Sequence, residues 1–412
     1  MASKQFVNGK RRFEWARRHM PVMDMVNGML SKSRPFENVK ISACLHVTAE
    51  TAVLVDALRA GGARVFLTAS NPLSTQDDIA EFLSSTRTAR IHSAHGESKA
   101  DYTQNILRAI AFSPDLIVDD GADLITAFHN VNPLGQVVIG ATEETSTGVL
   151  RLRNLETKSG LQFPVVAVND SDTKRMFDNR YGTGQSVVDG VMRATNMLLA
   201  GRNVVVCGYG WCGRGIASRM RGMGALVCVT EISPIKALEA AMDGFEVMTM
   251  DEAAGWGDLF VTATGNAGVI RASHMRRMSD GAVLCNAGHF DVEVQMGELR
   301  KISKGCSEVR PGVKEYRISE KKNVCVISDG RLVNLGAAEG HPPGVMDMSF
   351  ANQALSLEWL AENRDRLGSK VIDVPRQIQD SVAKFKLASM GIEIDSLTRT
   401  QEEYLSAWSE GT

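Results

Sequence analysis

The chain has 412 residues, of which 44% are hydrophobic, and a formal net charge of −2. This length predicts two large domains or about three smaller ones with ordinary hydrophobic cores. The near-neutral charge argues against nucleic acid as a partner, no apolar run approaches the roughly 20 residues of a membrane span, and the N-terminus lacks the apolar region of a signal peptide.

The first half of the chain alternates between expected strands and expected helices, the pattern of a doubly wound α/β domain. The expected strands are Lys40–Leu45, Ala63–Thr68, Leu116–Val118, Val137–Gly140 and Val165–Val168. The expected helices are Glu50–Ala60, Asp77–Ser84 and Gly148–Ser159. A domain connection is expected near Tyr181–Gln185, where a polar, glycine-punctuated segment precedes a long helix.

The second half predicts another α/β unit and then more helices. The expected strands are Asn203–Cys207, Leu226–Thr230, Glu246–Thr249, Leu259–Thr262 and Ala282–Cys285. The expected helices are Ser186–Leu199, Ile216–Arg221, Pro234–Met242, Ser349–Leu360, Gln377–Met390 and Gln401–Trp408. The predicted fold is therefore α/β, with two doubly wound parallel-sheet (Rossmann-like) domains and a small helical C-terminal tail.

A glycine-rich turn after the strand Asn203–Cys207 predicts a dinucleotide site. Gly208, Gly210 and Gly213 form G-x-G-x-x-G, and Glu231 directly follows the next strand. The first glycine permits a tight turn, the second lets the backbone approach a pyrophosphate, and the third lets helix and strand pack closely. A carboxylate at the position of Glu231 accepts hydrogen bonds from ribose hydroxyls and repels a 2′-phosphate, which favours NAD over NADP.

Four polar clusters follow other expected strands and predict one pocket, because open α/β sheets place their sites at the carboxyl ends of strands. Their members are His46, Thr48 and Glu50; Asp119 and Asp120; Glu143, Glu144 and Thr145; and Lys174, Asp178 and Asn179. Lys174 and Asp178 are spaced for one helical face, which fits a surface ion pair, a lysine brought near neutrality, or a carboxylate held ready for catalysis. His341 is either a turn residue or part of a hinge.

Seven cysteines include no C-x-x-C pair and eight histidines include no H-E-x-x-H, so the sequence does not predict a metal site. Reduced, mostly buried thiols and a cytoplasmic location are expected instead.

Along essentially its whole length the chain resembles the adenosylhomocysteinase (S-adenosylhomocysteine hydrolase) family. The segments that carry the resemblance, in order, are CLHVTAETAVL, SNPLSTQDD, DDGADL, EETSTGV, VNDSDTKRMFDNRYG, VCGYGWCGRG, TEISPIKALEA, NAGHFDVE, GRLVNLGAAEGHP and VMDMSFANQ. The short C-terminus QEEYLSAWSEGT is similar to the archaeal and thermophilic-bacterial branch. It lacks the Lys…Tyr tail that longer members insert into a neighbour's cofactor site, which implies that NAD exchanges more readily here.

The resemblance implies two α/β domains closing over a cleft in a homotetramer that keeps NAD bound through turnover. It places a discontinuous substrate-binding domain at residues 1–182 and 343–375, an NAD-binding Rossmann domain at 185–341 and a C-terminal helical tail at 376–412. Matched motif by motif, the implied catalytic residues are His46, Asp120, Glu144, Lys174, Asp178 and His289. The implied substrate contacts are Thr48, Glu50, Asp120, Glu144, Lys174, Asp178, His289, His341 and Met346. The implied cofactor contacts are Thr145, Ser146, Thr147, Asn179, Gly208, Gly210, Gly213, Glu231, Lys236, Thr264, Asn286, Gly288 and Asn334.

In the mechanism that the resemblance implies, the 3′-carbon of the nucleoside is oxidised, homocysteine leaves by β-elimination, water adds, and the ketone is reduced again. Lys174, beside Asp178, is expected to be the base for oxidation of the 3′-hydroxyl, and Glu144 to hydrogen-bond the ribose. Asp120 and His46 are expected to handle elimination and water addition.

The remaining implied contacts distribute around the nucleoside. His289 is expected at the sugar, Thr48 and Glu50 at the purine, and His341 at a gate. Thr183 stands where longer members have a cysteine, and Lys236 where they have an asparagine at the cofactor's adenosine ribose.

Three alternatives stay open from the sequence. S-inosylhomocysteine is a possible substrate of the same mechanism, although Glu50 suits the exocyclic amine of adenine. The second alternative is a non-catalytic relative that binds NAD and regulates a partner. The third is an ordinary 2-hydroxyacid-type dehydrogenase.

Overall fold

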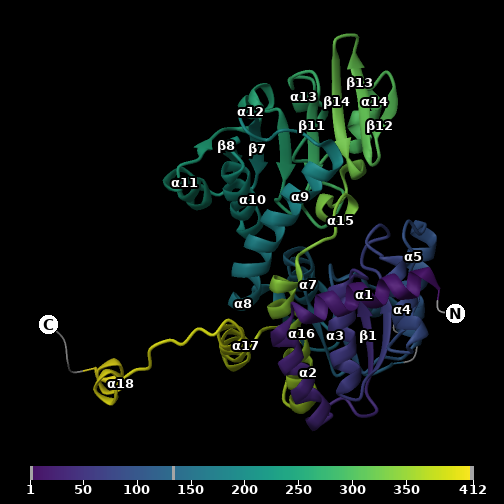
Figure 1. The fold of residues 1–412 in the computed structure, drawn as a ribbon, viewed down its shortest axis with the longest axis vertical. Coiled ribbons are helices and arrows are strands. Elements are labelled where there is room, and N and C mark those ends of the chain that lie inside the picture. The colour runs from purple at the N-terminus through teal and green to yellow at the C-terminus, as the bar shows by residue number, and fades with distance from the viewer. Residues whose placement is uncertain (1–2, 132–134, 409–412) are drawn as a thin grey trace.

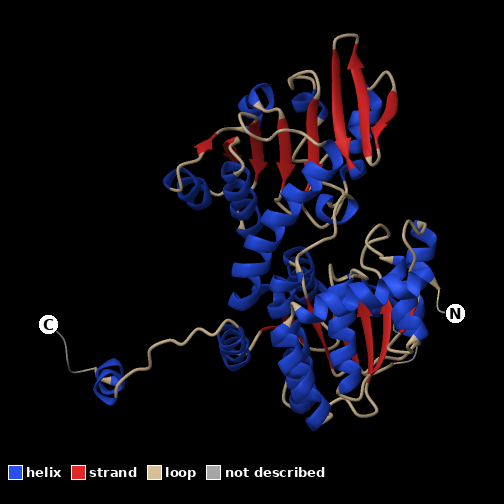
Figure 2. Cartoon of the chain, in the orientation of Figure 1, coloured by secondary structure: helices blue, strands red, loops and turns tan. Residues whose placement is uncertain are grey.

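The computed structural model describes residues 3–131 and 135–408. The chain folds into two α/β units that lie one above the other (Figures 1 and 2). Each unit consists of one β-sheet with its covering helices and is called a layer below. The lower layer, purple to blue in Figure 1, holds the N-terminal sheet, and the upper layer, teal to green, holds the second. No described helix is long and apolar enough to cross a membrane.

The first sheet has seven parallel strands in the order β15-β6-β5-β4-β1-β2-β3. They are β1 (Lys40–Cys44), β2 (Arg64–Thr68), β3 (Arg90–Ile91), β4 (Leu116–Asp119), β5 (Gly140–Glu143), β6 (Val165–Ala167) and β15 (Val371–Asp373). The strand order reverses between β1 and β4, and open α/β sheets bind ligands outside the carboxyl ends of strands at such a switch point.

Helices cover both faces of this sheet, and each face has its own hydrophobic core. One face is covered by α1 (Lys4–Arg18), α2 (Pro21–Ser33), α3 (Ala49–Ala60), α4 (Asp77–Ser85) and α16 (Pro343–Asn363). The other is covered by α5 (Lys99–Ala111), α6 (Asp123–Val131) and α7 (Ser146–Ser159). Because α16 follows the second sheet in the chain, the first layer is built from two separate parts of the sequence.

The second sheet has eight strands in the order β12-β13-β14-β11-β10-β7-β8-β9, with a switch point between β7 and β10. They are β7 (Asn203–Cys207), β8 (Leu226–Thr230), β9 (Glu246–Val247), β10 (Leu259–Thr262), β11 (Ala282–Asn286), β12 (Cys306–Arg310), β13 (Val313–Ser319) and β14 (Lys322–Ile327). Its helices are α9 (Thr183–Thr195), α10 (Trp211–Gly222), α11 (Pro234–Met242), α12 (Met250–Trp256), α13 (Ala272–Met275), α14 (Met296–Ile302) and α15 (Val333–Gly336). The antiparallel pairs β12–β13 and β13–β14, which the sequence analysis did not anticipate, follow from two-residue connections too short for a parallel crossover.

Two connections join the layers. The first begins with a short 3-10 turn (Val168–Asp170). After the extended residue Ser171 it continues as an unbroken helical run formed by α8 (Asp172–Lys174), a π-helical segment (Arg175–Gly182) and α9. The second leads from a 3-10 turn (Ser328–Gly330) through α15 into α16. The first includes the connection expected near Tyr181–Gln185, where the chain is helical.

Several expected bounds are wrong for identifiable reasons. The strand expected at Val137–Gly140 is instead Gly140–Glu143: Val137 is 83% exposed, whereas the polar Glu143 is fully buried in the sheet. The helix expected at Ser186–Leu199 ends at Thr195, because Asn196 adopts a left-handed conformation with φ of 53°. Thr249, expected in a strand, forms the capping box of α12.

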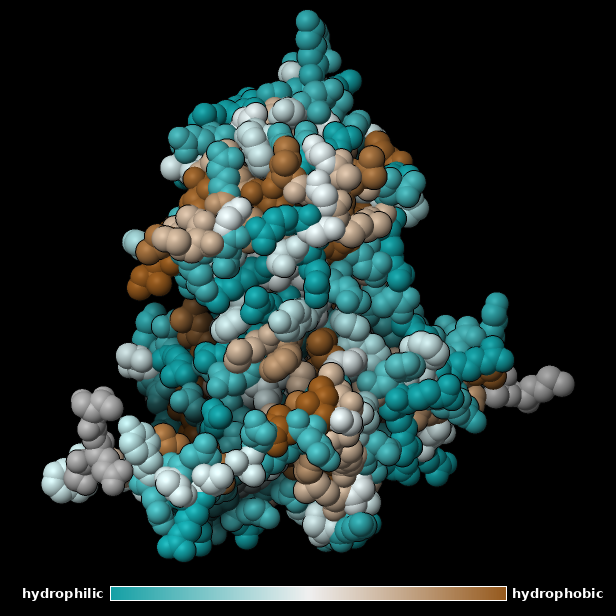
Figure 3. Space-filling model, turned by 60° about the vertical axis from the view of Figure 1, so that its left-hand side comes forward, coloured by the Kyte–Doolittle hydropathy of each residue, from teal (hydrophilic) through white to brown (hydrophobic). Residues whose placement is uncertain are grey.

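The C-terminal tail is helical, as predicted. Helix α17 (Arg376–Ser389) packs on α16 and α2, and α18 (Arg399–Ser406) extends away from the two layers at the end of a long segment (Figure 1). Residues 409–412 of the predicted tail lie outside the described residues. Exposed apolar side chains occur on the tail and along the α11 edge of the second layer. Those at the α11 edge are Ile232, Ile235, Leu238 and Met242. Hydrophobic patches, brown in Figure 3, are visible on the second layer.

Candidate active site

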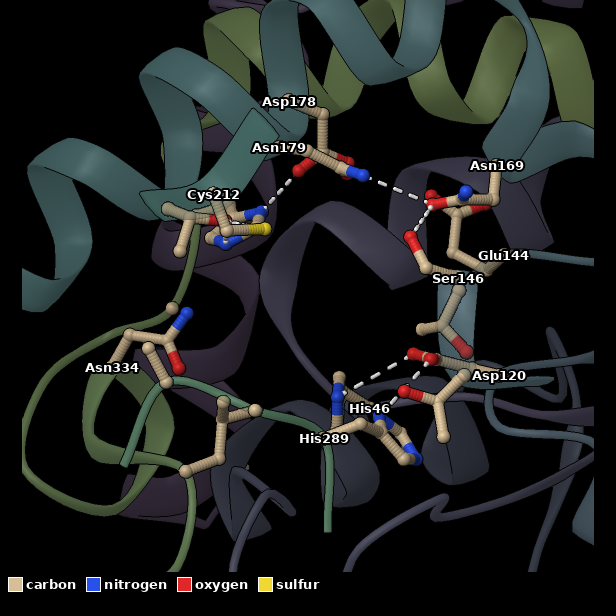
Figure 4. Close-up of a pocket in the computed structure, with 18 of the residues that line it drawn as sticks. His46, Asp120, Glu144, Ser146, Asn169, Asp178, Asn179, Cys212, His289 and Asn334 are labelled. Carbon is tan, nitrogen blue, oxygen red and sulfur yellow. Dashed lines mark hydrogen bonds and ion pairs between the residues drawn. The ribbon is translucent and has the colours of Figure 1, made fainter. Parts of the chain in front are cut away.

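A cavity of about 380 Å³ lies between the two layers, a volume typical of small-molecule sites. The predicted residues that line it are His46, Thr48, Glu50, Asp120, Glu144, Thr145, Ser146, Thr147, Lys174, Asp178, Asn179, Gly210, Lys236, Thr264, Gly288, His289, Asn334, His341 and Met346. Gly208, Gly213, Glu231 and Asn286 do not line it. Asp119 and Glu143, predicted members of the polar pocket, do not line it either: both are fully buried, and their carboxylates accept hydrogen bonds from backbone N–H groups. Side chains from both layers face this space (Figure 4).

Strand order explains why distant residues meet here. His46 follows β1 and Asp120 follows β4, the two strands that flank the switch point of the first sheet. Glu144 follows β5, the next strand outward. The predicted polar clusters therefore come together because consecutive parallel strands all end at the same edge of the sheet.

Lys174 lies at the centre of a buried charged cluster. Its Nζ is 3.3 Å from Asp178 Oδ2 and 3.7 Å from Glu144 Oε1, and it donates a hydrogen bond of 2.7 Å to Asn179 Oδ1. Burial works to lower the pKa of Lys174, but the charges of Asp178 and Glu144 outweigh it and raise the pKa. The lysine brought near neutrality, one of the sequence interpretations, therefore does not fit this cluster, and the surface ion pair is excluded by burial.

The two carboxylates of the cluster differ in state. Burial raises the pKa of Glu144 to about 8, in spite of the lowering effect of Lys174. Burial also works to raise the pKa of Asp178, yet Lys174 and His341 outweigh it and hold that pKa below its usual range. His341 Nδ1 lies 2.5 Å from Asp178 Oδ1. Asp178 is thus the fixed anion, and Glu144 is a carboxyl group that titrates near neutral pH.

Two residues of α16 that the sequence analysis did not single out hold these carboxylates. Ser349 donates a hydrogen bond of 2.7 Å from its hydroxyl to Asp178, and Gln353 donates one of 2.5 Å to Glu144 Oε2. They are four residues apart, so they face the same side of the helix. Both lie in the quoted VMDMSFANQ segment, but nothing in the local sequence marks them as partners of distant acids.

A second group forms at the other side of the cavity. His46 Nε2 is 3.4 Å from Asp120 Oδ2, and His289 Nδ1 is 3.7 Å from Asp120 Oδ1. The His289 ring packs directly over Gly121, whose φ of 107° and missing Cβ leave room for the imidazole. Burial lowers the pKa of His46 to about 4, against the raising effect of Asp120, so His46 is a neutral imidazole at pH 7.

Glu143 is fully buried behind Asp120, and its structural role was not predicted from the sequence. Its carboxylate accepts hydrogen bonds from the backbone N–H groups of Gly121, Ala122 and Thr145 at 2.8–2.9 Å, and from the Thr145 hydroxyl. It therefore ties the turn that carries Asp120 to the turn that carries Thr145. In the second layer Glu293 holds the turn at Thr264 in a similar way, because the N–H and the hydroxyl of Thr264 both donate hydrogen bonds to the Glu293 carboxylate.

The glycine turn has the predicted geometry. Gly208 has a φ of 100°, and a Cβ at Gly213 would collide with the carbonyl of Gly208. Gly210 faces open space at the start of α10, where no side chain caps the helix N-terminus. The end of this helix is consequently free to receive an anionic group.

Glu231 lies at the end of β8, as predicted. Its carboxylate accepts hydrogen bonds from the backbone N–H groups of Tyr209, Ile232 and Ser233 at 2.7–3.0 Å. Burial works to raise its pKa, but these bonds lower it, so Glu231 is ionised at the mouth of the turn.

Asn286 and Asn334, both predicted cofactor contacts, differ in their surroundings. Asn286 is fully buried and uses its amide internally: its Oδ1 accepts from Gly288 N and Thr262 Oγ1, and its Nδ2 donates to the carbonyls of Gly288 and Phe290. It shapes the turn that presents His289. Asn334 lines the cavity, and its buried Oδ1 has no hydrogen-bond partner among the described residues.

Two family models match separate parts of the chain. Residues 2–135 match the family model of S-adenosyl-L-homocysteine hydrolase, and residues 179–340 match the model of its NAD binding domain. A protein named adenosylhomocysteinase from Aquifex aeolicus is 53% identical, with 98% of this chain and 97% of that protein covered. One from Sulfurisphaera tokodaii is 51% identical with the same coverage.

Among solved structures, a dipicolinate synthase chain from Bacillus halodurans matches with a TM-score of 0.50 and 12% identity, covering 79% of this chain and 99% of that one. That likeness concerns the fold alone. The two family models and the relatives that match over nearly the full length show that this chain belongs to the S-adenosyl-L-homocysteine hydrolase family.

Proposed function

We propose that the chain catalyses the NAD-dependent, reversible hydrolysis of S-adenosyl-L-homocysteine to adenosine and L-homocysteine. The observation that carries the proposal is the presence of two separate proton-handling groups in one cavity beside a dinucleotide turn: the Lys174 cluster and the His46–Asp120–His289 group. A simple dehydrogenase needs one such group, whereas oxidation followed by elimination needs two.

The chemistry requires an oxidant because a thiolate leaves an unactivated sugar carbon poorly. When bound at the glycine turn, NAD would supply that oxidant, as the acceptor of a hydride from the 3′-carbon and the donor of it at the end of the cycle. A ketone at the 3′-carbon makes the 4′-hydrogen acidic, so that a base can remove it while homocysteine leaves by β-elimination. Water then adds to the resulting enone, and no reduced cofactor accumulates.

The residues of the glycine turn and its surroundings suit this cofactor. Gly210 leaves space at the open N-terminus of α10, the ionised Glu231 matches ribose hydroxyls, and the unpaired Oδ1 of Asn334 can accept from an amide. The residues assigned to cofactor binding are those implied by the resemblance: Thr145, Ser146, Thr147, Asn179, Gly208, Gly210, Gly213, Glu231, Lys236, Thr264, Asn286, Gly288 and Asn334. For Asn286 the assigned effect is indirect, through the turn at Gly288.

Lys174 and Glu144 are assigned jointly to the proton of the 3′-hydroxyl. Lys174 is held as an ammonium group, so it acts as a base only after passing a proton on. Glu144, 3.7 Å away and with a pKa of about 8, is the available acceptor when it is ionised. Asp178 keeps the lysine in place. The base of the oxidation step is therefore the pair, and its activity rises with pH toward 8.

Asp120 and His46 are assigned to the 4′ and 5′ positions, where they move protons during elimination and water addition. His46 is neutral, so its imidazole can take up or release a proton, and its Nδ1 lies 3.1 Å from the Ser70 hydroxyl, which orients the ring. His289 contacts the sugar from the second layer. These assignments separate the two halves of the reaction onto two sides of the cavity.

The purine is assigned to Thr48 and Glu50, with Met346 beside it and His341 as the gate. Thr48 caps α3, and Glu50 in its first turn is buried, which raises the pKa of its carboxyl group. An oxygen of Glu50 accepts from the exocyclic amine of adenine, which inosine lacks. S-inosylhomocysteine is the second candidate substrate, distinguished by one polar group only.

The larger organisation is part of the same proposal. Residues 1–182 and 343–375 form the substrate-binding domain, 185–341 the NAD-binding domain and 376–412 a tail. The exposed apolar residues of α11 and the outstretched α18 support assembly, for which a homotetramer is proposed. Free cysteines at all seven positions support a reducing, cytoplasmic location.

The deciding experiment measures release of homocysteine thiol from S-adenosylhomocysteine and from S-inosylhomocysteine by the purified protein. We expect release from both, with the larger kcat/KM for the adenosine compound and no net formation of reduced nicotinamide. No thiol from either compound would favour the non-catalytic relative, a preference for the inosine compound would reverse the substrate assignment, and accumulating reduced nicotinamide would favour a dehydrogenase.

A further inference from the structure

A second cavity, of about 490 Å³, borders the first one where α1, the start of α3, α9 and the second connection meet. Its volume is larger than the 380 Å³ of the first cavity and typical of small-molecule sites. Three described residues line both cavities: Glu50, Gly340 and His341. These residues therefore form the wall between the two spaces.

The wall is thin. Gly340, whose φ is 87°, contributes no side chain to it. The ring of His341 is held on the side of the first cavity, by Asp178 at 2.5 Å and by the Thr183 hydroxyl at 3.2 Å. The carboxyl group of Glu50 is consequently the side chain that separates the cavities beside Gly340.

The surroundings of Glu50 support this position between the two spaces. Glu50 is 9% exposed, and burial raises the pKa of its carboxyl group. A hydrogen bond with the side chain of Thr48, which lines only the first cavity, works to lower this pKa. The charge of Arg12 also works to lower it and that of Glu339 to raise it, and these two residues line only the second cavity. Glu50 is therefore influenced from both sides.

The lining of the second cavity suits an uncharged group with apolar surface. The Arg12 guanidinium lies 3.2 Å from Asp78 and 2.8 Å from Glu339, so its charge is already balanced. The apolar residues of the lining are Trp15, Ala49, Pro342 and Pro343. The indole of Trp15 is 61% exposed and gives a flat surface on which an aromatic ring can pack.

We propose that the enzyme accepts adenosine thioethers whose exocyclic amine carries a large uncharged substituent, such as a benzyl group, and that the second cavity holds this substituent. The inference rests on the proposed function, which assigns the purine to Thr48 and Glu50. A secondary amine keeps one N–H, so it can still donate a hydrogen bond to Glu50. The substituent passes beside Glu50, where Gly340 leaves the wall without a side chain. The 3′, 4′ and 5′ positions are unaffected.

The experiment runs the reaction of the wild-type protein toward the thioether and measures consumption of homocysteine thiol, as the sulfur replaces the 5′-hydroxyl and water is released. Adenosine is the reference nucleoside. We expect N⁶-benzyladenosine to react with a kcat/KM within about tenfold of that of adenosine. N⁶-benzyl-N⁶-methyladenosine, which has no N–H on this nitrogen, should be at least about tenfold worse than N⁶-benzyladenosine, because Glu50 loses its donor.

A variant that fills the second cavity tests where the substituent lies. Gln185 is exposed on α9 and lines the second cavity but not the first. Gln185→Trp should lower kcat/KM for N⁶-benzyladenosine by at least about tenfold. It should leave that for adenosine within about twofold, as is usual for an exposed position. Gln377→Trp is the matched control, since Gln377 is an exposed helical glutamine that lines neither cavity, and it should change neither value.

The reference reaction separates the possible failures. Product from adenosine, with N⁶-benzyladenosine more than about tenfold worse, would overturn this inference and leave the proposed function standing. No product from adenosine would overturn both. An unchanged kcat/KM for N⁶-benzyladenosine in Gln185→Trp would also overturn the inference, because the substituent would then lie elsewhere. Turnover of adenosine shows that this variant has folded, and the comparison of nucleosides with the wild-type protein decides the question if it has not.

Discussion

Replacing Lys174 by Met tests the buried cluster directly. The substitution keeps most of the side chain's volume but removes a cation 3.3 Å from Asp178 and 3.7 Å from Glu144. At an effective dielectric constant of 20, Coulomb's law gives roughly 5 kcal/mol for the first pair and about 4.5 for the second when both acids are ionised. These are gross values, since removing the lysine also removes its desolvation cost.

Removing one partner of a buried ion pair costs about 3–5 kcal/mol in the free energy of unfolding. With a pKa of about 8, Glu144 is mostly protonated at pH 7, so at that pH the loss comes mainly from Asp178. We therefore expect a loss in that range at pH 7 and a larger one at pH 9. Lys10→Met is the control, because its pair with Glu14 has the same four-residue spacing but is 56% exposed on both sides. That change should cost at most about 1 kcal/mol.

The assays are chemical denaturation at both pH values and single-turnover nicotinamide absorbance with substrate. In Lys174→Met the first reduction should slow by about 10²–10⁴-fold, the usual contribution of a positioned acid–base group. Wild-type kinetics of reduction in a folded Lys174→Met protein would refute the assigned role. A stability loss no larger than that of Lys10→Met would refute the electrostatic argument.

Four further outcomes are expected. The single-turnover rate of nicotinamide reduction should rise with pH to a midpoint near 8, and Glu144→Gln should abolish that rise. Asp120→Asn should still permit reduction but slow thiol release by about 10²–10⁴-fold, so equal losses in both steps would contradict the division of roles. The pKa of His46 is lower in the folded protein than in the unfolded chain, so protonation of His46 favours unfolding. Its contribution to the free energy of unfolding is therefore complete above about pH 6.5, and at most ~3 kcal/mol is lost as the pH drops toward 4. Denaturation experiments at several pH values should show a flatter pH dependence for His46→Asn. Glu231→Ala should raise NADP affinity relative to NAD in binding titrations, and an unchanged ratio would mean that Glu231 does not select the cofactor.

Local signals in the sequence predicted the features that depend on neighbouring residues. The glycine turn is one, because Gly208, Gly213 and the helix after them lie within one supersecondary unit. The spacing of Lys174 and Asp178 is another, since a helical turn brings them together regardless of the rest of the fold. Residues at the carboxyl ends of strands were grouped at one cavity, as the structure has them, except for Asp119 and Glu143, because the α/β pattern determines which edge they share but not which of them faces the cavity.

Features that depend on tertiary packing could not be predicted. Ser349 and Gln353 bond to acids 171 and 209 residues away, and no periodicity encodes such partners. The strand that contains Glu143 was predicted too early in the sequence, because a carboxyl group is not expected at a fully buried strand position. Here backbone N–H groups of neighbouring turns donate hydrogen bonds to it, and these bonds depend on tertiary structure. The charge of Lys174 depended likewise on two carboxylates whose positions come from different strands and helices.

Both connections between the layers meet at one carboxylate, which ties the second connection to the buried charged cluster. Asp178 belongs to the first connection and His341 to the second, and their atoms are 2.5 Å apart. The Thr183 hydroxyl lies 3.2 Å from the other ring nitrogen of His341 and so helps to hold it. His341 and Lys174 face different oxygens of Asp178, Oδ1 and Oδ2, so one carboxylate holds both the second connection and the lysine of the buried cluster. A change of charge at Asp178 would therefore act on the lysine and on the connection at once.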